Sequence, residues 1–214
     1  MSTTNQVMSE VRVLIVEDEP VIAENISMYL NNNNFVVSGI AYDDQDALHE
    51  LSHNTPDAVL LDINLDSDND GIDLANKIKS DFRIPFIFLT SYADREILNR
   101  AKTTEPWGYI VKPFNEKTIL ASLEMAISNF ARQANLHVPV LSLEKVNKHL
   151  LSQLSQREFD VLQLIYEGKT NQQISDKICV SINTVKKHIN SSYLKLDAAT
   201  RSGAIARLRQ LMMK

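Results

Sequence analysis

The chain has 214 residues, of which 44% are hydrophobic, and a formal net charge of −5. This length allows one large domain or two of ordinary size. The single cysteine, Cys179, excludes an internal disulfide framework, and no apolar run is long enough to span a membrane. Because the first ten residues also lack the apolar segment of a secretion signal, we expect a cytoplasmic protein.

The charges are distributed unevenly along the chain. Residues 1–136 contain 10 Lys and Arg and 21 Asp and Glu, whereas residues 137–214 contain 12 Lys and Arg and 6 Asp and Glu. The net charge is therefore −11 in the first part and +6 in the second. This asymmetry predicts two domains with different partners, and it suggests a polyanion as the partner of the second domain.

Short apolar runs alternate with segments of helical periodicity over the first 130 residues. Strands are predicted at 11–16, 35–40, 58–61, 86–89 and 109–111, and helices at 20–30, 44–51, 72–78, 94–103 and 115–127. Continuous apolar runs are typical of strands that are buried on both faces of a parallel sheet. The alternation therefore predicts an α/β fold, with a doubly wound five-stranded parallel sheet.

Five polar side chains directly follow four of these predicted strands: Glu17, Asp18, Asp62, Thr90 and Lys112. The carboxyl ends of parallel strands meet at one edge of the sheet, where ligands bind in open α/β folds. Taken singly, each residue has a structural alternative, since Asp62 can form a turn, Thr90 can cap a helix and Lys112 can form a salt bridge. The ordered set at four strand ends favours a functional site.

The chemistry of this set indicates phosphoryl transfer. Several carboxylates in one place repel each other unless a divalent cation or a basic group neutralises them, and carboxylate oxygens suit Mg²⁺. A lysine, a hydroxyl group and a metal ion around one carboxylate are what phosphoryl transfer to that carboxylate requires. The sequence therefore predicts an acidic Mg²⁺ site in which Asp62 accepts a phosphoryl group.

These residues, together with Pro113 and Phe114 after Lys112, resemble the receiver domain of two-component response regulators over about residues 10–130. The resemblance implies that a histidine kinase or a small phosphodonor phosphorylates Asp62. It also implies a set of Mg²⁺ ligands, with Glu17 acting through water: Glu17, Asp18, Asp62 and the backbone carbonyl of Asn64. The phosphoryl-binding and switch residues would be Lys112, Thr90 and Tyr109, although an aromatic residue such as Tyr109 at a strand end can also serve packing alone.

Three features depart from the family pattern. The loop after Asp62 lacks the usual proline and is acidic, and we prefer a solvated loop over a second metal site for Asp66, Asp68 and Asp70. Residues 105–107, Glu-Pro-Trp, stand where small residues are frequent. Asn64 and Tyr92 occupy positions that tune the lifetime of the phosphoryl group in the family, and we hypothesise that the bulky Tyr92 restricts the hydrolytic water.

The basic second half begins with residues 131–149, which we interpret as a linker that can contain a helical piece. Two capping boxes, at residues 155–158 and 170–173, predict the starts of two helices, which end near Gly168 and Ile178. Ser181 can cap a third helix, at about 182–195, and residues 199–213 carry a fourth.

The third of these helices is polar and basic on one face. Its apolar residues are spaced for a core and leave three polar residues outward, namely Lys186, Lys187 and Asn190. A short helix, a tight turn and a basic helix fit a helix-turn-helix, in which such side chains contact base edges or phosphates. The structural alternative is a solvated lysine face.

Residues 150–214 resemble the LuxR-type four-helix DNA-binding domain, on the basis of residues 154–158, 167–168, 171, 174–175 and 181–188. The resemblance implies that Lys186, Lys187 and Asn190 contact the major groove, while three residues lie nearer phosphates: Thr184, His188 and Lys195. His188 can equally be a packing residue, and Asp197 replaces the usual glycine. The last helix would pair two subunits through four apolar residues, unless these only complete the core: Ile205, Leu208, Leu211 and Met212.

We therefore predict a response regulator in which phosphorylation of Asp62 controls dimerisation and sequence-specific binding to double-stranded DNA. It would have no separate substrate, although it would release its own phosphoryl group. One alternative, a phosphate-ester hydrolase, is disfavoured because Asn64 stands where a general acid would be needed. A second is a phosphorylation-independent regulator that uses the receiver only for dimerisation. A third is a tail that binds protein, which the +6 charge disfavours.

Overall fold

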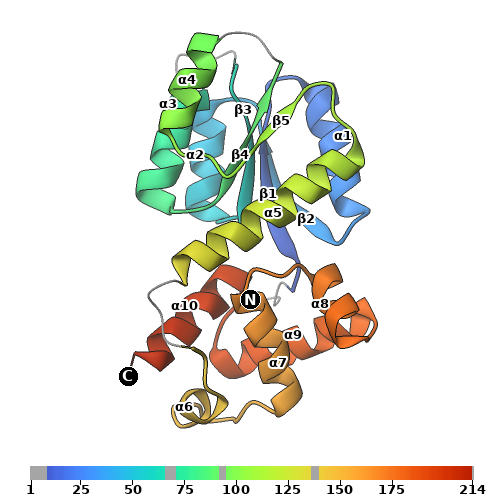
Figure 1. Ribbon diagram of the computed structural model, residues 1–214, viewed down its shortest axis with the longest axis vertical. Coiled ribbons are helices and arrows are strands. Elements are labelled where there is room, and N and C mark those ends of the chain that lie inside the picture. Colours follow the sequence, from blue (N-terminus) through green and yellow to red (C-terminus); the bar gives the residue numbers. More distant parts are fainter. Residues whose placement is uncertain (1–8, 66–70, 92–94, 136–139, 214) are drawn as a thin grey trace, which may run out of the picture. The chain divides into compact units, whose positions relative to one another are not determined.

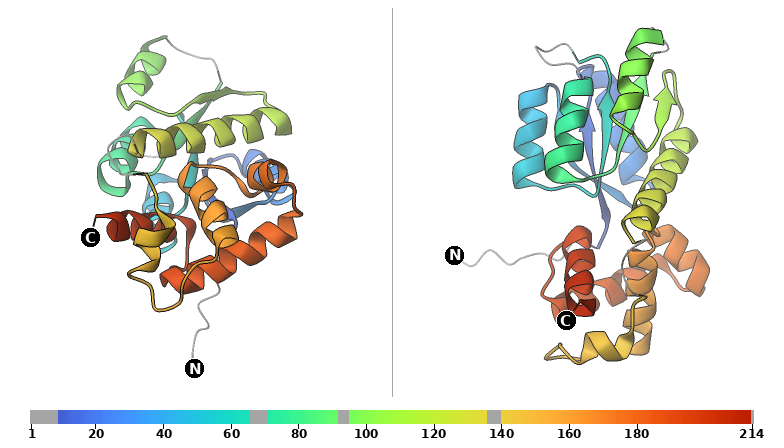
Figure 2. Two further views of the ribbon diagram at one scale, coloured as in Figure 1. Left: turned by 60° about the horizontal axis from the view of Figure 1, so that its bottom comes forward. Right: turned by 60° about the vertical axis from the view of Figure 1, so that its left-hand side comes forward.

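The computed structural model describes residues 9–65, 71–91, 95–135 and 140–213, and it is shown in Figures 1 and 2. The chain forms two compact units. One unit is Val11–Phe130, and the other begins at Ala131 and also includes Ser9 and Glu10. None of the helices in the described ranges combines the length and the apolarity needed to cross a bilayer.

The first unit is built on a parallel sheet of five strands. These are β1 (Val11–Val16), β2 (Phe35–Ala41), β3 (Ala58–Asp62), β4 (Phe86–Thr90) and β5 (Tyr109–Val111). Their order in the sheet is β2-β1-β3-β4-β5, and every adjacent pair is parallel. The predicted fold class is confirmed, and Asp62 is the last residue of the central strand.

Helices cover both faces of this sheet (Figure 1). One face packs against α2 (Asp44–His53), α3 (Gly71–Lys77) and α4 (Arg95–Thr103), and the other against α1 (Pro20–Asn31) and α5 (Glu116–Ala134). Successive strand residues point to opposite faces, so each strand contributes to two separate apolar cores. In β3, Val59 and Leu61 belong to the first core, and Ala58 and Leu60 belong to the second.

The third helix of this unit departs from the prediction of a regular helix at 72–78. After α3 the chain continues as a π-helix, η1 (Ile78–Phe82), and ends at Arg83 in the left-handed conformation with φ 55°. Ile78 remains fully buried in the core next to β4. The π-helix therefore extends the helical segment to Phe82, while Ile78 stays packed in the core.

The second unit is helical. It contains α6 (Leu143–Asn147), α7 (Gln156–Tyr166), α8 (Asn171–Ile178), α9 (Ile182–Leu196) and α10 (Arg201–Met212). Both predicted capping boxes are present, at Ser155 with Glu158 and at Thr170 with Gln173. One apolar core joins these helices around the fully buried Tyr193.

Candidate functional site

The polar residues predicted to converge at the carboxyl edge of the sheet do so around Asp62. Lys112 Nζ lies 2.6 Å from Asp62 Oδ2, and 2.8 Å and 2.7 Å from the two carboxylate oxygens of Glu17. Asp62 is 4% exposed and Glu17 is fully buried. Since these residues come from the ends of β3, β5 and β1, the sheet topology brings together side chains that are 45 to 95 residues apart in sequence.

Backbone hydrogen bonds beyond the strand ends hold this geometry. The N–H of Lys112 donates to the carbonyl oxygen of Thr90 at 2.7 Å, and the N–H of Ile63 donates to Leu89 at 3.1 Å. The N–H of Asn64 donates to Asp62 Oδ1 at 3.0 Å, so Lys112 and Asn64 engage different oxygens of the same carboxylate. The orientation of the Asp62 side chain is therefore fixed from two sides.

Gly71, the first residue of α3, lies against the backbone at the end of β3. Its N–H donates to the carbonyl oxygen of Ile63 at 3.0 Å. A Cβ atom at this position would lie 2.0 Å from the carbonyl oxygen of Asp62. Only glycine allows the backbone of α3 to approach the end of β3 so closely, and no local pattern in the sequence marks this requirement.

The acidic side chains are arranged for a cation. Glu17, Asp18 and Asp62 each offer a carboxylate oxygen, and these atoms all lie within 4.8 Å of one another. Glu17 Oε2 is buried and makes no well-aligned hydrogen bond, and the ammonium group of Lys112 contacts it at 2.7 Å. Oxygen donors with an excess of negative charge fit Mg²⁺, so the residues present are suited to this ion.

Burial and charge shift the pKa values of two groups in the cluster. Desolvation, reinforced by the charge of Asp62, raises the pKa of Glu17 to about 7, although the hydrogen bond from Lys112 opposes this shift. Desolvation tends to lower the pKa of Lys112, but hydrogen bonds and charges from Asp62 and Glu17 outweigh it and raise this pKa above its ordinary value. Lys112 therefore stays cationic at neutral pH.

Thr90 and Tyr109 lie on neighbouring strands beside this cluster. Thr90 is 6% exposed and pairs with Val111, one residue beyond the pair formed by Asp62 and Leu89. Tyr109 is 37% exposed, and its ring stacks on Phe88 with the centroids 5.9 Å apart. Tyr109 pairs with Phe88, so the buried Thr90 and the partly exposed Tyr109 lie diagonally, two register positions apart, on β4 and β5.

Several predicted features fall outside the described residues, namely Tyr92 and the acidic loop residues Asp66, Asp68 and Asp70. Residues 105–107 are described. Glu105 has a φ of 55° and pairs with Lys79 at 2.9 Å, and Trp107 packs edge to face on Phe130. The bulky Trp107 therefore contributes to the core at the α5 face.

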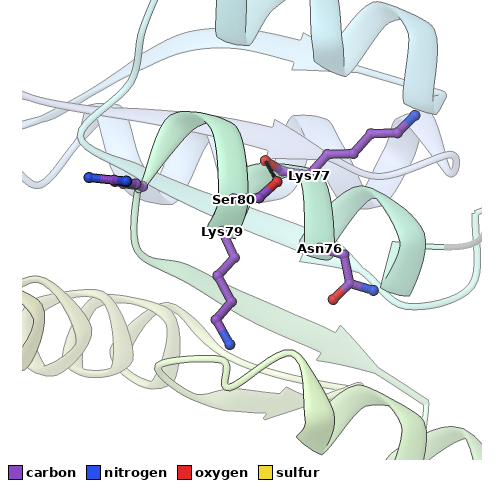
Figure 3. A pocket seen from close by; sticks show the side chains of 5 residues that line it. Asn76, Lys77, Lys79 and Ser80 are labelled. Atoms are coloured by element: carbon purple, nitrogen blue, oxygen red, sulfur yellow. Dashed lines mark hydrogen bonds between the residues drawn. The ribbon is translucent and has the colours of Figure 1, made fainter.

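A separate hollow of about 540 Å³ is lined by Asn76, Lys77, Lys79, Ser80 and Arg83. In Figure 3, Lys79 and Asn76 extend in one direction and Lys77 in another. Arg83 lies just before β4 begins, so this hollow is at the amino edge of the sheet, opposite Asp62. It contains no carboxylate and takes no part in the acidic cluster.

In the second unit, α9 presents the predicted polar face. Val185, Ile189 and Leu196 are fully buried, whereas Lys187 and Asn190 are exposed. Lys186 is half-buried and pairs with Glu10 at 2.8 Å, and Thr184 and His188 are also half-buried. The expected division of this helix into a core face and an outward face is therefore present.

Lys195 differs from the other basic residues of α9. Its Nζ atom lies 2.9 Å and 2.7 Å from the two oxygens of Glu158, and it donates to the carbonyl oxygen of Gln153. Desolvation would raise the pKa of Glu158, but hydrogen bonds from Lys195, Ser191 and Ser155 lower it to about 2. The ammonium group of Lys195 thus joins the end of α9 to the start of α7.

Three of the four apolar residues predicted for a subunit contact lie inside the core of their own unit. Leu208 is 0% exposed, Leu211 is 1% exposed and Met212 is 4% exposed, while Ile205 is half-buried against the same core. Their apolar character is explained by packing within one chain, which is the alternative considered for them. Of these four residues, Ile205 alone retains substantial exposure.

Comparisons with known proteins agree with both parts of this description. Residues 13–124 match the family described as response regulator receiver domain, and residues 152–208 match the family described as bacterial regulatory proteins, luxR family. The Response regulator protein VraR of Staphylococcus saprophyticus is 29% identical over 198 residues, which cover 91% of this chain and 94% of that protein. The Transcriptional regulatory protein PdtaR of Mycobacterium tuberculosis is 32% identical over 134 residues, which cover 63% of this chain and 65% of that protein.

Solved structures resemble the first unit. The signal receiver domain of a modulated diguanylate cyclase from Desulfovibrio desulfuricans matches with a TM-score of 0.55 and 34% identity. The match covers 57% of this chain and 97% of the chain in that structure. A response regulator receiver domain protein from Methanospirillum hungatei matches with a TM-score of 0.54 and 25% identity. This match covers 58% of this chain and 99% of the chain in that structure.

Proposed function

Because this chain belongs to the response regulators that join a receiver domain to a LuxR-type DNA-binding domain, we propose that phosphorylation of Asp62 controls its binding to DNA. The family makes the chain a regulator of transcription and not a classical enzyme. The proposal adds the phosphoacceptor, the partners and the means of control. We assign the receiver to about residues 10–130, a linker to 131–149 and the DNA-binding domain to 150–214.

The proposed phosphodonor is the phosphohistidine of a histidine kinase. A carboxylate oxygen of Asp62 attacks the phosphorus atom, the new P–O bond forms as the P–N bond breaks, and the imidazole leaves and takes up a proton. Lys112, already 2.6 Å from Asp62, neutralises charge on the phosphoryl oxygens. The same pocket would later admit water, so that the protein releases its own phosphoryl group.

Mg²⁺ would be held by Asp18, Asp62 and the backbone carbonyl of Asn64, with Glu17 acting through water. When bound, the ion supplies positive charge to the oxygens of the group in transfer. Lys112 alone cannot balance three carboxylates, and this charge excess is what supports the assignment of the ion.

The phosphorylated state would be read through Thr90 and Tyr109. The new charge on Asp62 attracts the hydroxyl group of Thr90, and Tyr109 changes its exposure as Thr90 moves. The phosphoryl group would thereby shift an equilibrium between two arrangements of the receiver that both exist before phosphorylation. The position of Thr90 and Tyr109 on neighbouring strands, two register positions apart, supports this route.

The output would be the binding of α9 in the major groove of double-stranded DNA. Lys187 and Asn190 are exposed on the outward face, and Lys186 lies beside them. Thr184 and His188 would lie nearer phosphates. Two linked domains in a homodimer would bind two half-sites with avidity, and α10, in which Ile205 keeps partial exposure, would form the contact between subunits. We infer a cytoplasmic site of action from this role.

The observation that carries the proposal is the contact of one lysine with both Asp62 and Glu17 in a buried acidic cluster. The test uses the full chain and its Asp62→Asn variant, which keeps the shape of the side chain. Each protein is treated with an acyl phosphate and Mg²⁺, and mass, oligomeric state and DNA affinity are measured together.

We expect wild type alone to gain one phosphoryl group, to dimerise and to bind DNA more tightly. Equal DNA binding by both proteins, with or without the donor, would show instead that the receiver acts only as a constant dimerisation module. Modification of the Asp62→Asn variant to the same extent would refute the assignment of the acceptor.

A further inference from the structure

Two histidines lie one helical turn apart on the exposed face of α2. His49 and His53 are both exposed, their ring centroids are 4.3 Å apart and their planes differ by 25°. In the stacked arrangement the in-plane lone pairs of the two rings run side by side. Because an i, i+4 pair projects from the same side of a helix and both side chains are exposed, rotation of the side chains brings the two nitrogens toward one ion. Because α2 runs back across the sheet before β3, His53 lies near the amino edge of the strands, opposite the Asp62 cluster.

A backbone contact determines which nitrogen of His53 is available. Its Nδ1 atom lies 2.9 Å from the carbonyl oxygen of His49. A carbonyl oxygen can only accept, so Nδ1 carries the hydrogen in this contact, and in the neutral ring Nε2 keeps its lone pair. Histidines that bind metals commonly donate their other N–H to a carbonyl group in this way.

The helix around the pair is acidic. It contains Asp44, Asp46 and Glu50 and no lysine or arginine. Negative charge on the same helix lowers the cost of bringing a cation to the imidazoles. His49 makes no hydrogen bond through its ring in the described part of the chain, so its nitrogens are not engaged elsewhere.

We propose that His49 and His53 chelate one divalent transition-metal ion of the class that prefers nitrogen ligands, such as Ni²⁺, Cu²⁺ or Zn²⁺. Imidazole suits these ions, whereas Mg²⁺ prefers oxygen and would not compete. Two protein ligands leave the other coordination positions to water. The site is independent of the proposed function, because it shares no residue with the Asp62 cluster.

The test is a calorimetric titration of the full chain with Ni²⁺ in the presence of excess Mg²⁺. Ni²⁺ is chosen because, unlike Cu²⁺, it does not oxidise the exposed Cys179. We expect one Ni²⁺ per chain. Either His49→Gln or His53→Gln should weaken binding by roughly 100-fold, because loss of a direct ligand should cost at least as much affinity as the loss of a residue that only supports a ligand. Helix content by circular dichroism confirms that the variants are folded.

A spacing variant separates chelation from the mere presence of histidines. Asp46→His combined with His49→Gln keeps two imidazoles on α2 but places them seven residues apart, about 10 Å along the axis. We expect it to bind as weakly as the single variants, while His149→Gln and Asp62→Asn should bind like wild type. The proposal is overturned if wild type binds no Ni²⁺, if the spacing variant or either single variant keeps wild-type affinity, or if Asp62→Asn loses it.

Discussion

Lys112 Nζ lies 2.6 Å from Asp62 Oδ2 in a pocket where the lysine side chain is only 14% exposed. The same ammonium group also contacts Glu17, so one cation balances two buried carboxylates. Removing one partner of a buried ion pair leaves the other charge uncompensated. This destabilises the folded state more than replacing both partners by apolar residues.

Lys112→Met should therefore destabilise the first unit by about 3 kcal/mol in the absence of Mg²⁺, because Glu17 and Asp62 then face each other without a cation. Added Mg²⁺ should recover much of this loss, since it neutralises the same carboxylates. Urea unfolding with and without Mg²⁺ measures both effects. A variant as stable as wild type in Mg²⁺-free buffer would contradict the charge balance described for the cluster.

Gly71→Ala should disturb the site around Asp62 by displacing the backbone of α3. Its Cβ would lie 2.0 Å from the carbonyl oxygen of Asp62, so α3 must move away from the end of β3. We expect a loss of about 2 kcal/mol or more in the free energy of unfolding, and slower phosphorylation by an acyl phosphate. Gly108→Ala is the matched control, because its Cβ would meet only Ile87 at 3.6 Å. Equal effects of the two substitutions would show that close approach is not what Gly71 provides.

Glu158 should make the second unit sensitive to acid. Its pKa is lowered to about 2 in the folded state from the ordinary 4.5. Its stabilising contribution is therefore complete above pH 4.5 and is lost as the pH falls toward 2. Glu158→Gln retains a side chain that can complete the capping box, so the comparison isolates the charge.

The difference in stability between wild type and Glu158→Gln should be about 2–3 kcal/mol at pH 7 and should shrink steadily below pH 4.5. Hydrogen exchange of the amides of α7 and α9 reports the stability of this unit within the full chain. A difference that stayed constant between pH 7 and pH 3 would mean that the ion pair with Lys195 does not carry it.

Basic residues of α9 should separate into two classes in DNA binding. Lys187→Ala should weaken affinity and lower the salt slope by about 1, because it removes one positive charge from the DNA interface, whereas Asn190→Ala should change sequence preference at one base pair. Lys195→Ala should mainly reduce stability, since Glu158 holds its ammonium group. Lys148→Ala, at an exposed position beside α6, serves as the control. A salt slope unchanged by Lys187→Ala would place that residue away from the DNA.

Local patterns in the sequence were sufficient for most of the fold. The strand that ends at Asp62 was predicted from a short apolar run, and the capping boxes at Ser155 and Thr170 were predicted from residue types at fixed spacing. Such features depend on neighbours within a few residues. The convergence of Glu17 with Lys112 followed from the rule for parallel strand ends.

What the sequence did not reveal depends on distant partners or on exact backbone paths. The partner of Lys195 is Glu158, 37 residues earlier, and no local pattern links them. The burial of Leu208 follows from how the helices pack, so its apolar type alone did not distinguish a core from a subunit contact. The π-helix before Arg83 has no characteristic amino-acid composition that would predict it. Glycine is needed at position 71 because any larger residue would collide with the carbonyl oxygen of Asp62.

The central strand β3 supplies alternate side chains to both apolar cores, Leu61 to one and Leu60 to the other. Any rearrangement that displaced this strand would have to repack both helical layers at once, and close-packed interiors resist that strongly. Asp62, the proposed acceptor, is thus the last residue of a strand that is packed into both cores. If phosphorylation of Asp62 controls the protein as proposed, we expect the response to involve the segments that follow the strands rather than a displacement of the sheet.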